Sequence, residues 1–258
     1  MPMHTHVSVR TDIAKYAAFI CLLFCAVGCM GTSIAVLRID SEMVVSADSL
    51  VTDMSGARTT VCKISPSGSG FFALAGTADY GGTGIATFDA TKIARQVGKE
   101  KTLKQRADAF RRIALPGFRN AVEDMRKNWP AEFKQVVGKA QPLQVIFFGI
   151  EGGTAAYQLE VFAVTLAKGK VVVTPERVAC PAACKVGFID IKLLGENEAA
   201  QPAARLIFDP NNLLESSRKL VGLEERFAPN DVGGPIVSVA VQVFKPVVWT
   251  DPSHVCGH

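Results

Sequence analysis

Short runs of apolar and β-branched residues mark the beginning of the chain beyond residue 31. Two pairs of such runs come first, 33–37 with 43–47 and 59–64 with 71–75, and a short polar or Gly/Ser-rich segment separates the members of each pair. Runs of this length that are bounded by turn residues predict β-hairpins. We therefore expect four strands at the start of the folded part of the chain.

Helical spacing replaces this pattern in the next part of the sequence. From 84 to 97 and again from 103 to 127, apolar residues recur every three or four positions. This period predicts two amphipathic helices. Pro116 and Gly117 interrupt the second one, and a proline inside a helix removes a backbone hydrogen bond. We expect a kink or a division of the helix at this point.

Strands and then helices return in the second half. The predicted strands are 143–149, 157–164, 170–174 and 185–194, the predicted helices are 199–208 and 212–227, and a last strand is 235–243. Segregated runs of this kind argue against the alternating order of a parallel α/β sheet. They predict an α+β fold, a four-layer αββα sandwich in which two mainly antiparallel sheets pack face to face. We find no boundary within 32–258 and treat it as a single domain.

Composition and charge exclude several classes of protein. Of the 258 residues, 48% are hydrophobic and 20% charged, which fits a folded chain rather than a disordered one. Lys and Arg number 28 against 24 for Asp and Glu, so the net charge is only +4. Because the basic residues are scattered, no electrostatic footprint for nucleic acid is visible, and we expect no nucleic-acid partner.

The first part of the chain, residues 1–31, has the character of a leader. A few charged residues precede an apolar run from 16 to 30 that has no charge. This run is shorter than the roughly 20 residues of a membrane span and close to the core of a secretory signal. Lipidation at Cys29 and a translation start at Met30 are alternatives. Export, anchoring and a cytoplasmic location stay open, and we expect membrane contact only through this leader.

The cysteines beyond the leader leave three alternatives: zinc ligands, a disulfide bond, or ordinary buried or surface residues. Cys180, Cys184 and Cys256, the last flanked by histidines, would together offer zinc ligands, but their spacing lacks the C-x-x-C pair of a strong zinc signal. Disulfide bonding is the alternative if the chain is exported. We assign no function to these residues and predict no metal site.

Four short motifs fall at strand ends. Gly31-Thr32 opens the first predicted strand, Asp48 follows the second, Lys63 lies in the third and Gly76 follows the fourth. Asp48 is sixteen residues after Thr32. With these motifs the chain resembles a proteasome β-subunit, and it is similar to the related bacterial ring peptidase that works with an unfoldase. Both belong to the amino-terminal-nucleophile hydrolases.

The resemblance implies a threonine-type amide-bond hydrolase, a peptidase that cleavage before Thr32 activates. A threonine hydroxyl is a weak nucleophile until a base takes its proton. A free amino terminus, whose pKa is about 7.7 to 8.0, is such a base. The resemblance implies that Thr32 supplies nucleophile and base, Lys63 lowers the pKa of the amine, Asp48 orients Lys63, and the N–H of Gly76 binds the oxyanion.

The same resemblance implies the rest of the site and its partners. Leu74 and Val51 are expected to line a substrate pocket that prefers an apolar residue, and no cofactor or metal is required. The expected substrate is a peptide or protein. A homo-oligomeric ring and an unfoldase are the implied partners.

The sequence also departs from the family pattern. The region 194–198 lacks the family's serine, and Val232 stands where a second serine is expected. The glycine pair of this element, Gly233 and Gly234, is kept, and Asp231 or Asn230 is expected to reach the site from a shifted position. Two rival hypotheses stay open: a non-catalytic assembly subunit tethered by the leader, and an exported amidase or acylase that acts on a small amide.

Overall fold

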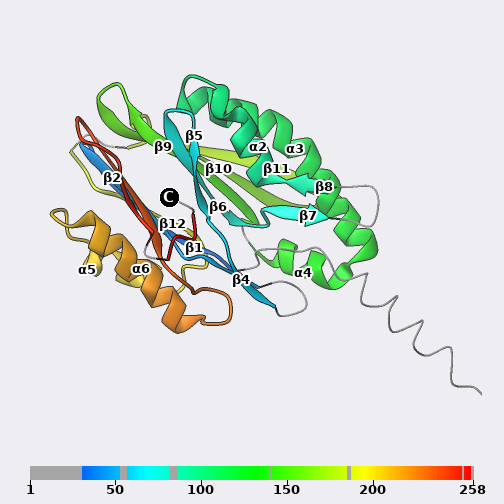
Figure 1. Cartoon of the computed structure of the whole chain (residues 1–258). Coiled ribbons are helices and arrows are strands. Elements are labelled where there is room, and N and C mark those ends of the chain that lie inside the picture. The colour runs from blue at the N-terminus through cyan, green and yellow to red at the C-terminus, as the bar shows by residue number, and fades with distance from the viewer. Residues whose placement is uncertain are drawn as a thin grey trace, which may run out of the picture.

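Two five-stranded sheets form the centre of the protein, which we describe from a computed structural model (Figure 1). Every strand pairing within them is antiparallel. The predicted leader lies outside the described residues apart from Gly31. The structure describes residues 31–52, 57–81, 87–139, 141–184, 187–251 and 253–256.

The strands follow one another across each sheet in an order that mixes early and late segments. The first sheet runs β12 (Asp190–Gly195), β1 (Ser33–Ile39), β2 (Glu42–Ala47), β13 (Val237–Gln242) and β14 (Val248–Thr250). The second sheet runs β11 (Lys170–Cys180), β10 (Thr154–Ala167), β9 (Leu143–Glu151), β6 (Gly70–Gly76) and β5 (Ile64–Ser67). Two small ribbons pair β3 (Leu50–Thr52) with β4 (Arg58–Thr60) and β7 (Asp79–Gly81) with β8 (Thr87–Asp89).

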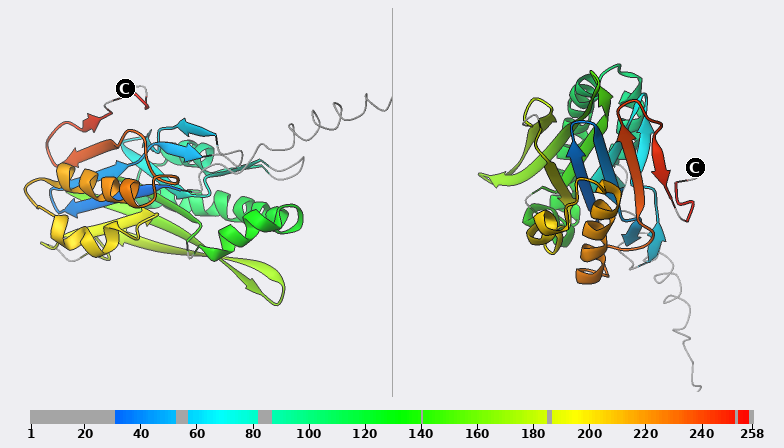
Figure 2. Two further views of the ribbon diagram at one scale, coloured as in Figure 1. Left: turned by 90° about the horizontal axis from the view of Figure 1, so that it is seen from below. Right: turned by 90° about the vertical axis from the view of Figure 1, so that its left-hand side faces the viewer.

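Helices cover the outer face of each sheet, so the protein has four layers (Figure 1). The second sheet is covered by α2 (Ala90–Gln96), the short helix η1 (Val97–Lys99), α3 (Leu103–Asn128) and α4 (Pro130–Gly138). The first sheet is covered by α5 (Ala200–Ile207) and α6 (Leu213–Phe227). The end of the β10–β11 hairpin, where β10 ends and β11 begins, extends beyond the helices (Figure 2). Among the described residues, no helix has the length and apolar character to cross a membrane.

Apolar residues at successive positions let one strand pack into a hydrophobic core on each of its two faces. In β1, Ile34 and Val36 belong to the cluster between the two sheets, whereas Ala35 and Leu37 belong to the cluster under α6. Successive side chains of a strand point to opposite faces, so a strand that is apolar at every position is buried on both. The prediction of an α+β sandwich of antiparallel sheets is confirmed.

The predicted strand 59–64 is wrong as a single element. β4 ends at Thr60 and pairs with β3, whereas β5 begins at Ile64 and pairs with β6. The chain changes partners between them, so Cys62 and Lys63 lie in the connection. The periodicity of apolar residues does not report which strand is the neighbour, and the break was therefore invisible in the sequence.

The predicted helices differ from the structure in two places. The helix expected from residue 84 begins at Ala90, where Asp89 caps it by accepting a hydrogen bond from the Lys92 N–H. The division expected at Pro116 is absent, and α3 runs through it. Phe110 and Phe118, on either side of Pro116, are both fully buried against the second sheet. This packing holds both halves of α3 on one surface.

Two disulfide bonds join the four cysteines of the described residues. Cys180 is bonded to Cys184, so of the alternatives for these two cysteines the structure has the disulfide and not zinc ligation. Cys62 is bonded to Cys256, which lies 194 residues away. The second bond ties the C-terminal segment to the connection that carries Lys63.

Replacing both Cys62 and Cys256 by serine should lower the free energy of unfolding by roughly 2 to 5 kcal/mol, because this bond closes a very long loop. Urea denaturation of the oxidised proteins measures the loss. The matched control replaces Cys180 and Cys184, which are only 4 residues apart, and should lose less because loop entropy grows with loop length. An equal or larger loss in the control would contradict this account.

Candidate active site

Thr32 lies at the entrance to β1 and is almost completely buried, with 2% of its surface exposed. Its carbonyl accepts a hydrogen bond of 2.7 Å from the Glu196 N–H. Its hydroxyl oxygen Oγ1 is buried and has no hydrogen-bond partner among the described residues. Ser49 Oγ and Ser67 Oγ are also buried without a partner among the described residues, so the unpaired hydroxyl makes Thr32 a candidate only together with its position in the lining of a cavity.

Asp48 and Lys63 form a buried ion pair beside Thr32. Lys63 Nζ lies 2.9 Å from Asp48 Oδ1 and 2.8 Å from Oδ2. Two backbone donors complete the carboxylate, the Ser33 N–H to Oδ1 at 2.8 Å and the Gly233 N–H to Oδ2 at 3.3 Å. Because Ser33 follows Thr32 directly, the carboxylate also anchors the backbone that carries the candidate nucleophile.

Burial and charge act in opposite directions on Asp48. Burial is the largest influence and raises the pKa of its carboxyl above the ordinary value. The Lys63 ammonium and the N–H groups of Ser33 and Gly233 favour the charged form and lower that pKa in part. A carboxylate and an ammonium this deeply buried are tolerated only together, since either one alone would be an uncompensated charge.

Lys63 also reaches the peptide bond that precedes Thr32. Its Nζ donates a hydrogen bond of 3.4 Å to the Gly31 carbonyl oxygen. The carbon of this carbonyl is bonded to the Thr32 nitrogen, so the ammonium lies next to the atom that cleavage would turn into an amino terminus. A like charge within about 4 to 6 Å disfavours protonation of an amine.

Gly76 turns its backbone toward the same site. It has φ of +87°, and a Cβ added to it would lie 2.1 Å from the Pro142 carbonyl oxygen. The Leu74 N–H donates to the Lys63 carbonyl, so the backbone N–H and C=O of Leu74 point away from β9. The N–H and C=O groups of successive residues in a strand point to opposite sides. Gly76 is two residues after Leu74, so its N–H points to the same side of β6, the side on which Lys63 lies.

A cavity of about 420 Å³ contains both Thr32 and Gly76. Its other lining residues are polar or glycine: Gly138, Lys139, Gln141, Gln144, Gly195, Glu196, Asn197 and Glu198. Leu74 and Val51, the predicted pocket residues, do not line it. Leu74 packs in the core cluster under the helices of the second sheet, and Val51 lies in the ribbon of β3 and β4.

The predicted auxiliary residues lie around the ion pair. Gly233 bonds Asp48 directly, and its carbonyl accepts from the N–H groups of Ser49 and Leu50. A Cβ added to Gly31 would lie 2.1 Å from the Asp231 carbonyl oxygen. Asp231 thus contacts the leader side of the Gly31–Thr32 bond through its backbone. Gly234 has φ of +76°, a conformation that favours glycine.

Several polar residues of the site were missed in the sequence. Gln144 accepts a hydrogen bond of 2.7 Å from the Gly195 N–H, and it also contacts Gln141. Lys139 and Glu196 form an ion pair of 2.7 Å across the cavity. These residues come from two segments, 139–144 and 195–196, which are far apart in the chain and share no motif, so no spacing signalled them.

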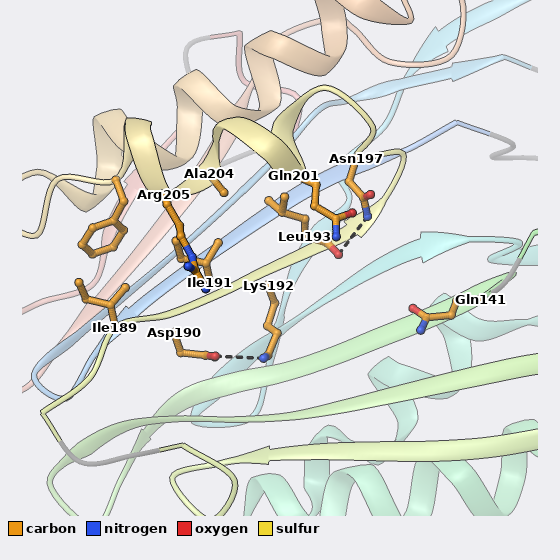
Figure 3. Close-up of a pocket in the computed structure, with 11 residues that line it drawn as sticks. Gln141, Ile189, Asp190, Ile191, Lys192, Leu193, Asn197, Gln201, Ala204 and Arg205 are labelled. Carbon is orange, nitrogen blue, oxygen red and sulfur yellow. Dashed lines mark hydrogen bonds and ion pairs between the residues drawn. The ribbon is translucent and has the colours of Figure 1, made fainter.

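A second and larger cavity, of about 910 Å³, adjoins the first along β12 and α5 (Figure 3). Gln141 and Asn197 line both cavities. The larger one is an extended groove that follows five consecutive residues, from Ile189 to Leu193. The candidate active site is therefore one end of a longer depression.

Comparison with known proteins returns structures but no sequence family. No protein-family model and no curated protein matches the sequence. One similar solved structure is Anbu, an ancestral beta-subunit, from Yersinia bercovieri, with 11% identity and a TM-score of 0.47 over 86% of this chain and 88% of that chain. Another is Anbu from Hyphomicrobium sp. strain MC1, with 14% identity and a TM-score of 0.44 over the same shares.

These findings correct the family named from the motifs. Anbu proteins are proteasome-related but distinct from the proteasome β-subunits and the ring peptidase that the sequence resembles. The identification of this chain as a proteasome β-subunit-like protein is therefore wrong. At this level of similarity the comparison identifies no activity, so the function has to be argued from the site itself.

Replacing Asp48 by Asn should lower the free energy of unfolding by about 3 to 5 kcal/mol, because Lys63 would be left buried without its counter-charge. Denaturant unfolding of the variant measures this. The matched control is Asp108→Asn, whose carboxylate is half exposed in ion pairs with Lys104 and Arg177 and should contribute about 1 kcal/mol or less. If the two losses are equal, Asp48 and Lys63 are not the strongly coupled pair described here.

Proposed function

We propose that this protein is an amide-bond hydrolase that uses Thr32 as an amino-terminal nucleophile after cleavage of the Gly31–Thr32 bond. The observation that carries the proposal is the contact of the buried Lys63–Asp48 pair with the Gly31 carbonyl. The four-layer arrangement of antiparallel sheets supports an amino-terminal-nucleophile hydrolase fold. This proposal rests on the geometry of the site and not on the family comparison.

Cleavage before Thr32 supplies the missing base. In the uncleaved chain the Thr32 nitrogen is an amide and accepts no proton, whereas a free amino group does. Lys63 lowers the pKa of that amine through like-charge repulsion, so more of it is unprotonated at neutral pH. The amine then takes the proton of the Thr32 hydroxyl as the oxygen attacks the substrate carbonyl.

The remaining roles follow from what each group offers. The carbonyl oxygen of the substrate gains negative charge as it is attacked, and the N–H of Gly76 stabilises it, an interaction that typically contributes about 100- to 1,000-fold in rate. The protonated amine next donates its proton to the leaving nitrogen. An acyl group is left on Thr32, and water hydrolyses it through the same amine.

The lining of the cavity bears on the substrate. Polar side chains such as Gln144 and Lys139 surround Thr32, so we propose peptides or other amides with hydrogen-bonding groups rather than the apolar residue expected from the sequence. A homo-oligomer stays part of the proposal. Assembly with an unfoldase stays a prediction from the sequence.

The two disulfide bonds support an exported protein. Disulfides persist in oxidising compartments and are rare in the cytosol. They join Cys62 to Cys256 and Cys180 to Cys184. Together with the apolar run predicted as a leader, they favour export over a cytoplasmic location.

Replacing Thr32 by Ala should abolish hydrolysis of a fluorogenic peptide amide, with a loss of about 1,000-fold or more, because nucleophile and base act as one unit. Thr32→Ser keeps a hydroxyl on the same amine and serves as the matched control, which should retain much of the activity. Intact-mass measurement should show that the active protein begins at Thr32. Full activity in the alanine variant, or in a chain that still carries its leader, would overturn the proposal.

A further inference from the structure

The groove beside the active site runs along an open sheet edge. β12 is the outermost strand of the first sheet, and among the described strands it pairs with β1 alone. An edge strand presents a row of backbone N–H and C=O groups that a further extended chain can pair with. In this protein the row ends at Gly195, which also lines the cavity of Thr32.

Hydrogen bonds on the far side of β1 show which groups face outward. The Asp48 N–H donates to the Ser33 carbonyl, so the backbone groups of Ser33 point toward β2. Alternate residues of an antiparallel strand face opposite neighbours, and Ile34 therefore faces β12, where its partner is Leu194. The backbone groups of Leu194 therefore pair with β1.

The same alternation turns the residues before Leu194 outward. Leu193 and Ile191 have their backbone groups on the open edge, and Asn197 Nδ2 donates to the Leu193 carbonyl at 3.4 Å. This bond places that carbonyl on the open side. Both backbone groups of Ile191 and the N–H of Leu193 remain there without a strand partner among the described residues.

Three charged side chains line the groove, those of Asp190, Lys192 and Arg205. Asp190 and Lys192 pair at 3.0 Å, so their charges compensate. Arg205 extends from α5 toward Ile191 (Figure 3) and has no ion pair among the described residues. The groove as a whole carries one positive charge in excess, which favours an acidic group in its occupant.

We infer that this groove binds the substrate as an extended peptide, which adds a strand to the edge of β12 and leads its scissile bond to Thr32. The inference rests on the proposed function and names its substrate class. A peptide is favoured over a small amide because the site continues past Gln141 and Asn197 into the larger cavity. β-strand addition of this kind obtains affinity from main-chain hydrogen bonds. An acidic side chain of the peptide contacts Arg205.

The test uses the Thr32→Ala protein and a fluorescein-labelled ten-residue peptide with glutamate at alternate positions. Two N-methylated versions carry the methyl groups on alternate amides, in one register or in the other. Only alternate N–H groups of an added strand face the sheet. One version should therefore bind at least about tenfold more weakly by fluorescence anisotropy, and the other should bind like the parent peptide. Equal affinities of all three peptides would overturn the inference.

Variants of the protein supply the second comparison. Ile191→Pro removes an outward N–H at an edge position where proline is tolerated, and it should weaken the parent peptide about tenfold, whereas Ile191→Val should not. Arg205→Gln should weaken the peptide roughly two- to fivefold, and Arg112→Gln, on α3, should leave it unchanged. Unaltered binding in both Ile191→Pro and Arg205→Gln would contradict the proposed position.

The outcomes also separate this inference from the proposed function. Hydrolysis that needs Thr32 but is as fast for a single-residue amide as for the ten-residue peptide rejects the groove and keeps the enzyme. Register-dependent binding without any hydrolysis keeps the groove and rejects the enzyme. Sedimentation velocity without peptide tests another occupant, because a dimer that Ile191→Pro abolishes would assign the edge to a second copy of this chain.

Discussion

The buried ion pair between Lys63 and Asp48 is the interaction on which the site depends. Asp48 follows β2 in the first sheet, and Lys63 precedes β5 in the second, so the pair joins the two sheets. Both side chains are almost completely buried, and the charge of the carboxylate is compensated by the Lys63 ammonium together with the N–H groups of Ser33 and Gly233. The same contact that stabilises the sandwich thus holds an ammonium against the bond before Thr32.

Much of the fold was predictable because strands that are apolar at every position and helices with one apolar face leave clear periods. The first hairpin and α3 are examples. The approach of Thr32 to Asp48 was predictable as well, since both lie at the same end of adjacent strands. The split between β4 and β5, the bond from Cys62 to Cys256 and the position of Gln144 depend on contacts between distant segments. No local pattern records such contacts.

The motifs identified residues that the structure brings together, and they were misleading about family. A threonine, a carboxylate and a lysine at strand ends describe what an amine-assisted nucleophile needs, and those needs do not distinguish one family from another. Two of the similar solved structures are Anbu proteins, with TM-scores below 0.5. The polar cavity, the two disulfides and the open edge of β12 are properties of this chain that the motifs did not predict.

The most direct test measures the pKa of the Thr32 amine in the processed protein, by following the ¹³C shift of that residue against pH. We expect a value below the reference of about 7.7 to 8.0. We also expect a rise toward that reference in the double variant Asp48→Asn/Lys63→Met, which removes both buried charges together. An amine that titrates at the same pH in both proteins would contradict the role assigned to Lys63.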